Sequence, residues 1–347
     1  MENKRTIAVT GASGYIASWV VKKLLNHGHT VHATVRDLSN KEKTTHLLKQ
    51  GEIHPGKLKM FEADLLEGGF KEAFLGCDSV IHIASPFLIG KVNDPQRELV
   101  DPALEGTRRV LEAVNAIETI TKVVLTSSVV AMYNDAKEAQ KLPEKTFTSD
   151  CWNTTASLTN QPYNYAKTVA EKEAWKMCTE QSRWTLTTIH PAFVMGPSLT
   201  TRVDGASMQF MVDTMRGQMK MGAPALSYGF VDVRDVAESH VHALEVDYTG
   251  ERFISANEVM DLLEFGELVQ RVTEHTEYPL PKKHLSSWLF YIAGPLRGFS
   301  MKFIRQNLGY RFSFDNRPIQ EKLGVRFRSM DETFRDMVLQ MERDNLI

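Results

Sequence analysis

Short, continuous apolar runs alternate with helical patterns through the first half of the chain, and this alternation limits the possible folds most strongly. The candidate strands are Ile7–Thr10, Val31–Val35, Leu58–Phe61, Val80–Ala84, Val123–Thr126 and Leu186–Ile189. Strands that are apolar throughout are typical of a parallel sheet with helices on both faces. We therefore predict an α/β fold, a doubly wound (Rossmann-type) parallel sheet with right-handed crossovers.

The alternation weakens beyond about residue 190. A methionine-rich helical pattern covers 208–221, strand–helix signals follow at Phe230–Val233 and Arg252–Ser255, and the tail from about 256 looks helical. These patterns predict a larger domain of residues 1–190 plus about 231–255. A smaller, discontinuous and mostly helical domain would comprise about 191–230 plus 256–347.

Charge and cysteine content exclude several classes of protein. The 347 residues carry 41 Lys+Arg and 43 Asp+Glu, whereas a dedicated nucleic-acid binder normally has a basic surplus. Cys77, Cys151 and Cys178 form no C-x-x-C pair, so we expect neither a disulfide framework nor a metal site. With no apolar run near the roughly 18 residues of a membrane span and no secretion signal, we expect a cytoplasmic protein.

A glycine turn follows the first predicted strand directly. Its residues are Gly11, Ala12, Ser13, Gly14, Tyr15, Ile16 and Ala17. A turn without bulky side chains lets a pyrophosphate approach the helix N-terminus, where free N–H groups and the helix dipole favour negative charge. The spacing G-x-x-G-x-x-A differs from the usual G-x-G-x-x-G, and the alternative is a generic strand–helix turn. Its position predicts that the larger domain binds a dinucleotide and the smaller one a substrate.

The tip of the second strand bears on the choice of dinucleotide. Arg36 suits the 2′-phosphate of NADP, and Lys43, about two helical turns on, could add a second cation. Asp37 next door would instead suit the ribose hydroxyl of NAD, and Arg36 could be a solvated loop residue. We predict NADPH as the cofactor.

A tyrosine and a lysine then share one helix face. Tyr163 and Lys167 are four residues apart, whereas Tyr165 points elsewhere. A neighbouring ammonium favours the phenolate and so lowers the tyrosine pKa toward neutrality. Ser128, at the tip of the fifth strand, could hold a carbonyl oxygen beside Tyr163, with Ser127 as the adjacent rival. Without the other motifs, a tyrosine and a lysine at this spacing are commonly ordinary surface residues of a helix.

Together these motifs resemble the extended short-chain dehydrogenase/reductases. The matching segments are Gly11–Ala17, Thr34–Asp37, Ala63–Leu65, His82–Pro86, Val100–Thr107, Thr126–Ser128, Cys151–Trp152, Tyr163–Lys167, His190–Pro197 and Phe230–Val236. They cover about residues 1–255 and look most like the branch of dihydroflavonol reductase, cinnamoyl-CoA reductase and microbial aldehyde and ketone reductases.

The resemblance implies further cofactor contacts. Asp64 and Leu65 would lie by the adenine, and Ala84, Ser85 and Pro86 along the path to the nicotinamide ribose. Thr126 and Tyr163 are further expected cofactor contacts. Pro191 and Val194 would contact the carboxamide, while Lys167 would bind ribose hydroxyls. Asp64 as a helix cap and Ser85-Pro86 as a simple turn are the alternatives; His82 and His190 are expected to be core residues.

The resemblance also bears on the substrate. Five positions after the serine, plant dihydroflavonol reductases carry a polar residue that contacts the flavonoid, and here Tyr133 stands there. A dihydroflavonol is therefore not the first choice. Phe87, Tyr133, Phe193 and Tyr228 are the expected substrate contacts, and aromatic or phenylpropanoid-like aldehydes and ketones are the expected substrates.

The C-terminal region contains a basic segment. Residues 278–314 hold no acidic residue but six cations, which are Lys282, Lys283, Arg297, Lys302, Arg305 and Arg311, together with the apolar run 288–292. Such a segment could bind an anionic group of a substrate, such as a CoA phosphate, or the surface of an anionic membrane. The alternative is a pair of helices with solvated basic faces.

We therefore predict a monomeric or homodimeric NADPH-dependent reductase of aldehydes or ketones, in which Tyr163 donates the proton, Ser128 fixes the oxygen and Lys167 tunes the tyrosine. Its partner is a small molecule. The alternatives are a nucleotide-sugar epimerase or dehydratase on the same scaffold, and a non-catalytic protein that senses NADP.

Overall fold

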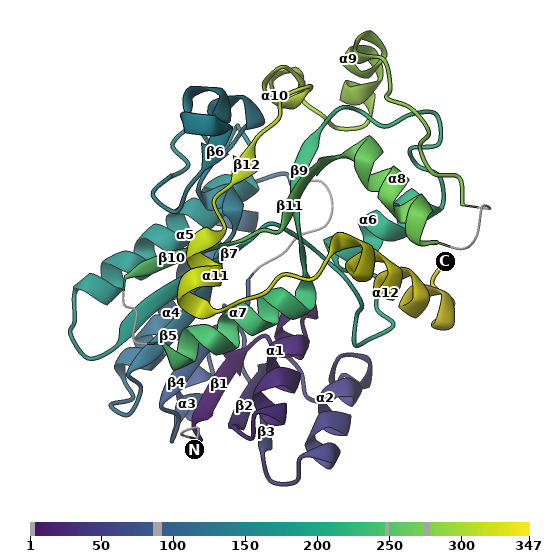
Figure 1. Ribbon diagram of the computed structural model, residues 1–347. Helices are drawn as coiled ribbons and strands as arrows, with labels where there is room; N and C mark the ends of the chain where they lie inside the picture. The colour runs from purple at the N-terminus through teal and green to yellow at the C-terminus, as the bar shows by residue number, and fades with distance from the viewer. Residues whose placement is uncertain (1–3, 86–91, 247–249, 274–277) are drawn as a thin grey trace.

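The centre of the fold is a seven-stranded parallel sheet, seen in a computed structural model that describes residues 4–85, 92–246, 250–273 and 278–347 (Figure 1). Its order is β10-β7-β5-β4-β1-β2-β3. The strands are β1 Thr6–Thr10, β2 Thr30–Val35, β3 Leu58–Glu62, β4 Ser79–His82, β5 Lys122–Thr126, β7 Thr185–Pro191 and β10 Glu251–Ser255. The direction of winding reverses between β1 and β4, so ligands are expected outside the carboxyl ends of these strands. The predicted fold class is confirmed.

Helices cover both faces of this sheet. One layer holds α1 (Tyr15–Asn26), α2 (Lys41–Ile53) and α7 (Val233–Glu245), and the other holds α3 (Phe70–Phe74), α4 (Asp101–Asn115) and α5 (Pro162–Thr179). Neighbouring residues of β1 serve opposite layers, because Ile7 and Val9 pack with α1 and α7 whereas Ala8 packs with α3 and α4. Burial on both faces explains why several strands contain continuous apolar runs, such as Val123, Val124 and Leu125 of β5.

A smaller part stands at the carboxyl ends of the strands. It contains the three-stranded sheet β11-β9-β8, formed by β8 (Phe193–Met195), β9 (Ser227–Asp232) and β11 (Glu258–Asp261), and the pair β6 (Thr146–Phe147) and β12 (Ser313–Phe314). Its helices are α6 (Ala206–Met215), α8 (Leu262–Val272), α9 (Ser287–Leu296), α10 (Met301–Asn307) and α12 (Met330–Arg343). Met195, Met208 and Met211 pack against Phe230 in its core. No helix in the described ranges is long and apolar enough to cross a bilayer.

Several expected elements have other bounds. The helix expected over 208–221 ends at Met215, because Gly217 adopts a φ of +85° where an added Cβ would lie 2.7 Å from the ring of Pro279. Val233 begins α7 instead of ending a strand, since Asp232 caps that helix by accepting from the N–H of Arg234. The tail is not purely helical either, because it contains β11 and β12.

One C-terminal helix packs on the larger part of the molecule. In α11 (Arg317–Leu323), Ile319 and Leu323 belong to the core cluster that also contains Ile7 and α7 (Figure 1). The sequence assigns α11 to the smaller domain, and the division into two domains stays a prediction.

Candidate active site

A cavity of about 1650 Å³ opens at the carboxyl ends of the central strands. Its walls include the turn after β1, the ends of β2, β4, β5 and β7, and one face of α5. The predicted site residues in its lining are Gly11, Ser13, Gly14, Tyr15, Ile16, Arg36, Lys43, Asp64, Leu65, Ala84, Ser85, Thr126, Ser128, Tyr133, Tyr163, Lys167, Pro191, Phe193, Val194 and Tyr228. Pro86 and Phe87 lie outside the described residues. The fold thus brings the described candidates together, and their individual roles remain predictions.

The glycine turn needs glycine for two separate reasons. Gly11 has a φ of +64°, and a Cβ added there would lie 3.0 Å from the Cα of Ala84. A Cβ on Gly14 would lie 3.2 Å from the carbonyl oxygen of Gly11. The turn therefore lets the ends of β1 and β4 approach closely and leaves bare backbone facing the cavity at the start of α1. This arrangement fits a dinucleotide pyrophosphate.

The tip of β2 presents a cation to the cavity. The Arg36 side chain is 76% exposed, and its Nε lies 3.0 Å from Oδ2 of Asp64. Asp37 faces other partners, because its Oδ1 accepts hydrogen bonds from the N–H (2.8 Å) and hydroxyl (2.6 Å) of Ser39, which lower the pKa of Asp37. An engaged Asp37 beside an accessible Arg36 favours a 2′-phosphate over a bare ribose hydroxyl.

A second cation near the glycine turn has no signal in the sequence. Arg202 lies in the loop that precedes α6, and its guanidinium donates to the carbonyl oxygen of Ser13 (3.3 Å) and pairs with Asp204 (2.5 Å). Burial, reinforced by the charge of Arg202, lowers the pKa of His46 to about 4. Nε2 of His46 lies 2.7 Å from the hydroxyl of Ser18. Arg202 therefore places a guanidinium, paired with Asp204, beside the predicted phosphate site.

The serine, tyrosine and lysine reach the cavity from two elements. Ser128 follows β5, where its Oγ caps a short helix by accepting from the N–H of Val130 (3.4 Å). Tyr163 and Lys167 occupy successive turns of α5. The adjacent Ser127, the alternative candidate, already has a partner, because its hydroxyl donates a hydrogen bond to Oε2 of Glu171 at 2.6 Å. The structure therefore favours Ser128 as the hydroxyl available to a ligand.

The environment of Tyr163 differs from the one that the sequence argument expects. That argument calls for an acidified phenol, but burial raises the pKa of Tyr163 to about 12. Burial also lowers the pKa of Lys167 to about 8, against the opposing effect of the Glu171 carboxylate. Burial therefore disfavours the phenolate form of Tyr163. A protonated phenol is the form that can donate a proton during reduction.

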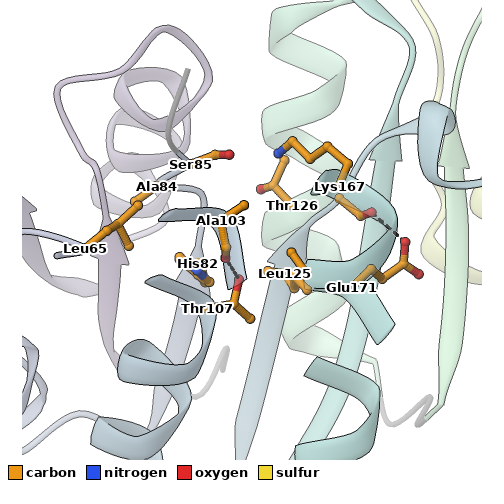
Figure 2. Close-up of a pocket in the computed structure, with 12 residues that line it drawn as sticks. Leu65, His82, Ala84, Ser85, Ala103, Thr107, Leu125, Thr126, Lys167 and Glu171 are labelled. Carbon is orange, nitrogen blue, oxygen red and sulfur yellow. Dashed lines mark hydrogen bonds between the residues drawn. The ribbon is translucent and has the colours of Figure 1, made fainter. Parts of the chain in front are cut away.

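Glu171, one turn beyond Lys167 and not identified from the sequence, is the centre of a buried polar cluster. Its carboxylate accepts from Nε of Arg252 (2.7 Å) and lies 2.8 Å from Nε2 of His190. Burial opposes its ionisation, yet the pKa of Glu171 is well below its usual value because His190 and Arg252 stabilise the charge. In Figure 2 the side chains of Lys167 and Glu171 leave α5 in opposite directions, the lysine toward Thr126 and Ser85. Glu171 thus connects the turn of α5 next to Lys167 with β7 and β10.

The histidines of the strands are buried, as the sequence predicts. His82 is 2% exposed and its Nδ1 lies 2.8 Å from the hydroxyl of Thr10. Burial, reinforced by the cation of Lys167, lowers the pKa of His82 to about 3. The imidazole of His82 is therefore neutral. His82 and His190 are buried residues of β4 and β7, the strands that end at the cavity.

The far end of the cavity is largely apolar. The rings of Phe193 and Phe210 meet edge to face with centroids 5.1 Å apart, and Tyr133 stacks on Phe147 at 4.5 Å. Burial raises the pKa of Tyr228 to about 12, so its hydroxyl stays protonated. Further lining comes from Met208, Met219, Leu226, Leu289 and Phe290, with Gln218 and Arg297 among the polar groups. Such walls suit an apolar or aromatic group.

The chain belongs to the NAD dependent epimerase/dehydratase family, whose model matches residues 7–255. It is 41% identical to cinnamoyl-CoA reductase CAD2 of Medicago truncatula over 69% of this chain and 72% of that protein. It is 32% identical to tetraketide alpha-pyrone reductase 1 of Arabidopsis thaliana over 96% and 94% of the two chains. Gre2 of Candida albicans in complex with NADPH superposes with a TM-score of 0.78, at 26% identity over 98% of this chain and 99% of that one.

These similarities confirm the resemblance to the extended short-chain reductases. They also confirm the predicted class, an oxidoreductase, and the predicted cofactor, NADP(H).

Proposed function

We propose that the protein reduces an aldehyde or ketone, of an aromatic or phenylpropanoid-like kind, to the alcohol with NADPH. The observation that carries this proposal is the presence of Ser128, Tyr163 and Lys167 in one cavity with the glycine turn. The reductases among its relatives and the NADPH complex of a structural neighbour support it. We further propose a monomer or homodimer in the cytoplasm that acts on a small molecule.

In the proposed mechanism the protein places a carbonyl oxygen between two hydroxyl groups. NADPH, held by the glycine turn and Arg36, would supply the hydride for the carbonyl carbon. The Ser128 hydroxyl donates a hydrogen bond to the oxygen as negative charge develops on it, and Tyr163 transfers its proton there. The ammonium of Lys167 then stabilises the tyrosinate that remains and holds ribose hydroxyls, while Glu171 favours the charged form of the lysine.

The direct test is a spectrophotometric assay of NADPH oxidation with aromatic aldehydes, aliphatic ketones, a dihydroflavonol and a hydroxycinnamoyl-CoA. We expect turnover with aromatic carbonyl compounds to exceed that with the dihydroflavonol. NADPH binding without turnover on any of them would instead indicate a sensor of NADP. A dinucleotide that stays bound through purification, with activity on sugar nucleotides, would indicate an epimerase or dehydratase.

Replacing Arg36 tests the choice of cofactor. We expect Arg36→Ala to lower kcat/KM for NADPH by roughly 10- to 100-fold, because a hydrogen-bonded ion pair with the 2′-phosphate is lost. Activity with NADH, which lacks that phosphate, should be unchanged. Lys41→Ala is the matched control, since Lys41 is an exposed cation that begins α2 and does not line the cavity. Equal losses with both dinucleotides would show that Arg36 does not bind the 2′-phosphate.

A further inference from the structure

Helix α9 has apolar side chains on its outer face as well as on its inner one. Leu289, Phe290 and Ala293 face inward and line the cavity. On the opposite side, Trp288, Ile292 and Leu296 follow one another at four-residue spacing and are 67%, 62% and 88% exposed. We call these three residues the outer face of α9. A surface helix normally turns polar side chains to water, so a helix that is apolar all round requires a second contact.

Two methionines extend this exposed apolar surface. Met221, 73% exposed, lines the same cavity, and Met301, 40% exposed, begins α10. Trp288, Leu296 and Met221 are the most exposed large apolar side chains among the described residues. Met221 and residues of α9 and α10 thus make up five of the twelve exposed large apolar side chains among the described residues, at the end of the molecule that α9 occupies in Figure 1.

The exposed charges that flank the outer face of α9 along the chain have one sign. Lys282, Lys283, Arg297, Lys302 and Arg305 are exposed, and the chain from 278 to 314 contains no acidic residue. Arg311, the sixth cation of this segment, is neutralised by Asp261 (2.6 Å) and Glu264 (2.5 Å) of α8. Five exposed cations in the same segment as the exposed Trp288, Ile292, Leu296 and Met301 complement a surface that is both negative and apolar.

We propose that the outer face of α9 docks on an anionic membrane surface. Trp288, Ile292 and Leu296 would enter the boundary between headgroups and acyl chains, while the flanking lysines and arginines contact anionic headgroups. A protein or a second copy of this chain would need acidic groups to match the cations. Because the inner face of α9 lines the cavity, docking places the cavity rim at the bilayer, where an apolar carbonyl compound partitions.

Vesicle co-sedimentation of the full chain tests this proposal, with vesicles of phosphatidylcholine alone or mixed with phosphatidylserine. We expect binding to the anionic vesicles, weakened at high salt because screening acts on the exposed cations. Lys302→Glu/Arg305→Glu should reduce the binding constant on the order of tenfold or more. Trp288→Ser/Ile292→Ser should abolish binding, since it removes the apolar insertion.

Leu48→Ser/Ile53→Ser is the matched control. Leu48 and Ile53 are 53% and 66% exposed on α2, far from α9 (Figure 1), and their replacement should leave vesicle binding intact. Equal sedimentation with both kinds of vesicle, or an equal loss in this control, contradicts the proposal. Concentration-dependent self-association that Trp288→Ser abolishes, without vesicle binding, would show that a second copy covers this face.

The docking proposal does not depend on the proposed function. None of the four replaced side chains on α9 and α10 lines the cavity, so NADPH oxidation with a water-soluble aldehyde should be retained in these variants. Loss of vesicle binding and loss of catalysis are therefore measured separately.

Discussion

Tyr163→Phe is expected to lower kcat for carbonyl reduction by about 10²- to 10⁴-fold, which is the usual contribution of a positioned proton donor. The substitution removes one hydroxyl from a buried ring and leaves the ring itself in place. The glycine turn and Arg36 lie on other elements, so the dissociation constant for NADPH should hardly change. Steady-state kinetics and fluorescence titration with NADPH separate the two effects.

Tyr165→Phe provides the matched control for this variant. Tyr165 lies two residues further along α5, packs with Leu99, Val100 and Ala103, and is not among the residues that line the cavity. Its variant should keep the activity of the parent protein. Near-parental turnover of Tyr163→Phe would exclude the tyrosine as proton donor, whereas a similar loss in both variants would point to a disturbed helix.

The sequence predicts that the candidate residues of this site lie together because their placement follows from local spacing. In a parallel sheet the carboxyl ends of neighbouring strands meet at one edge, so residues that follow the predicted strands must lie close together. Gly11, Arg36 and Ser128 each follow a strand in this way. The spacing of four between Tyr163 and Lys167 places both on one helix face without knowledge of the tertiary structure.

The parts that the sequence does not predict depend on distant contacts. Arg202 approaches the glycine turn across 189 residues, from a loop without a motif. Gly217, in the left-handed conformation just beyond α6, lies against Pro279 from another segment, so that no Cβ could be accommodated there. The pKa of Tyr163 depends on how deeply the phenol is buried, and spacing along the helix reveals only its neighbour Lys167. Local patterns thus place the candidate catalytic groups but not the surroundings that shift their pKa values.

Glu171 is the clearest case, and it leads to the largest expected effect on stability. Its partners Ser127, His190 and Arg252 are 44, 19 and 81 residues away in the chain. Arg252 also donates to the carbonyl oxygen of Cys151 and stacks at 3.8 Å on the ring of Trp152. This one carboxylate therefore joins α5 to β5, β7 and β10 and to the segment that leads to α5.

Glu171→Ala is expected to lower the free energy of unfolding by about 3–5 kcal/mol, because it leaves the buried guanidinium of Arg252 without its counter-charge. Urea denaturation followed by circular dichroism measures the change. Removal of the carboxylate also deepens the fall in the pKa of Lys167, since Glu171 opposes the effect of burial there. In the fraction that remains folded, activity should therefore decline at a lower pH than in the parent protein.

Glu173→Ala separates this effect from the general loss of a glutamate in α5. Glu173 pairs with Arg108 at 2.8 Å on the outer side of the helix, where Arg108 is 36% exposed. An ion pair with such access to solvent contributes about 0–1 kcal/mol, so its loss should be small. If both variants were destabilised equally, the buried cluster around Glu171 would contribute no more than a surface ion pair. A large difference, accompanied by the shift in pH dependence for Glu171→Ala alone, would identify Glu171 as the residue that both anchors α5 and positions the charge of Lys167.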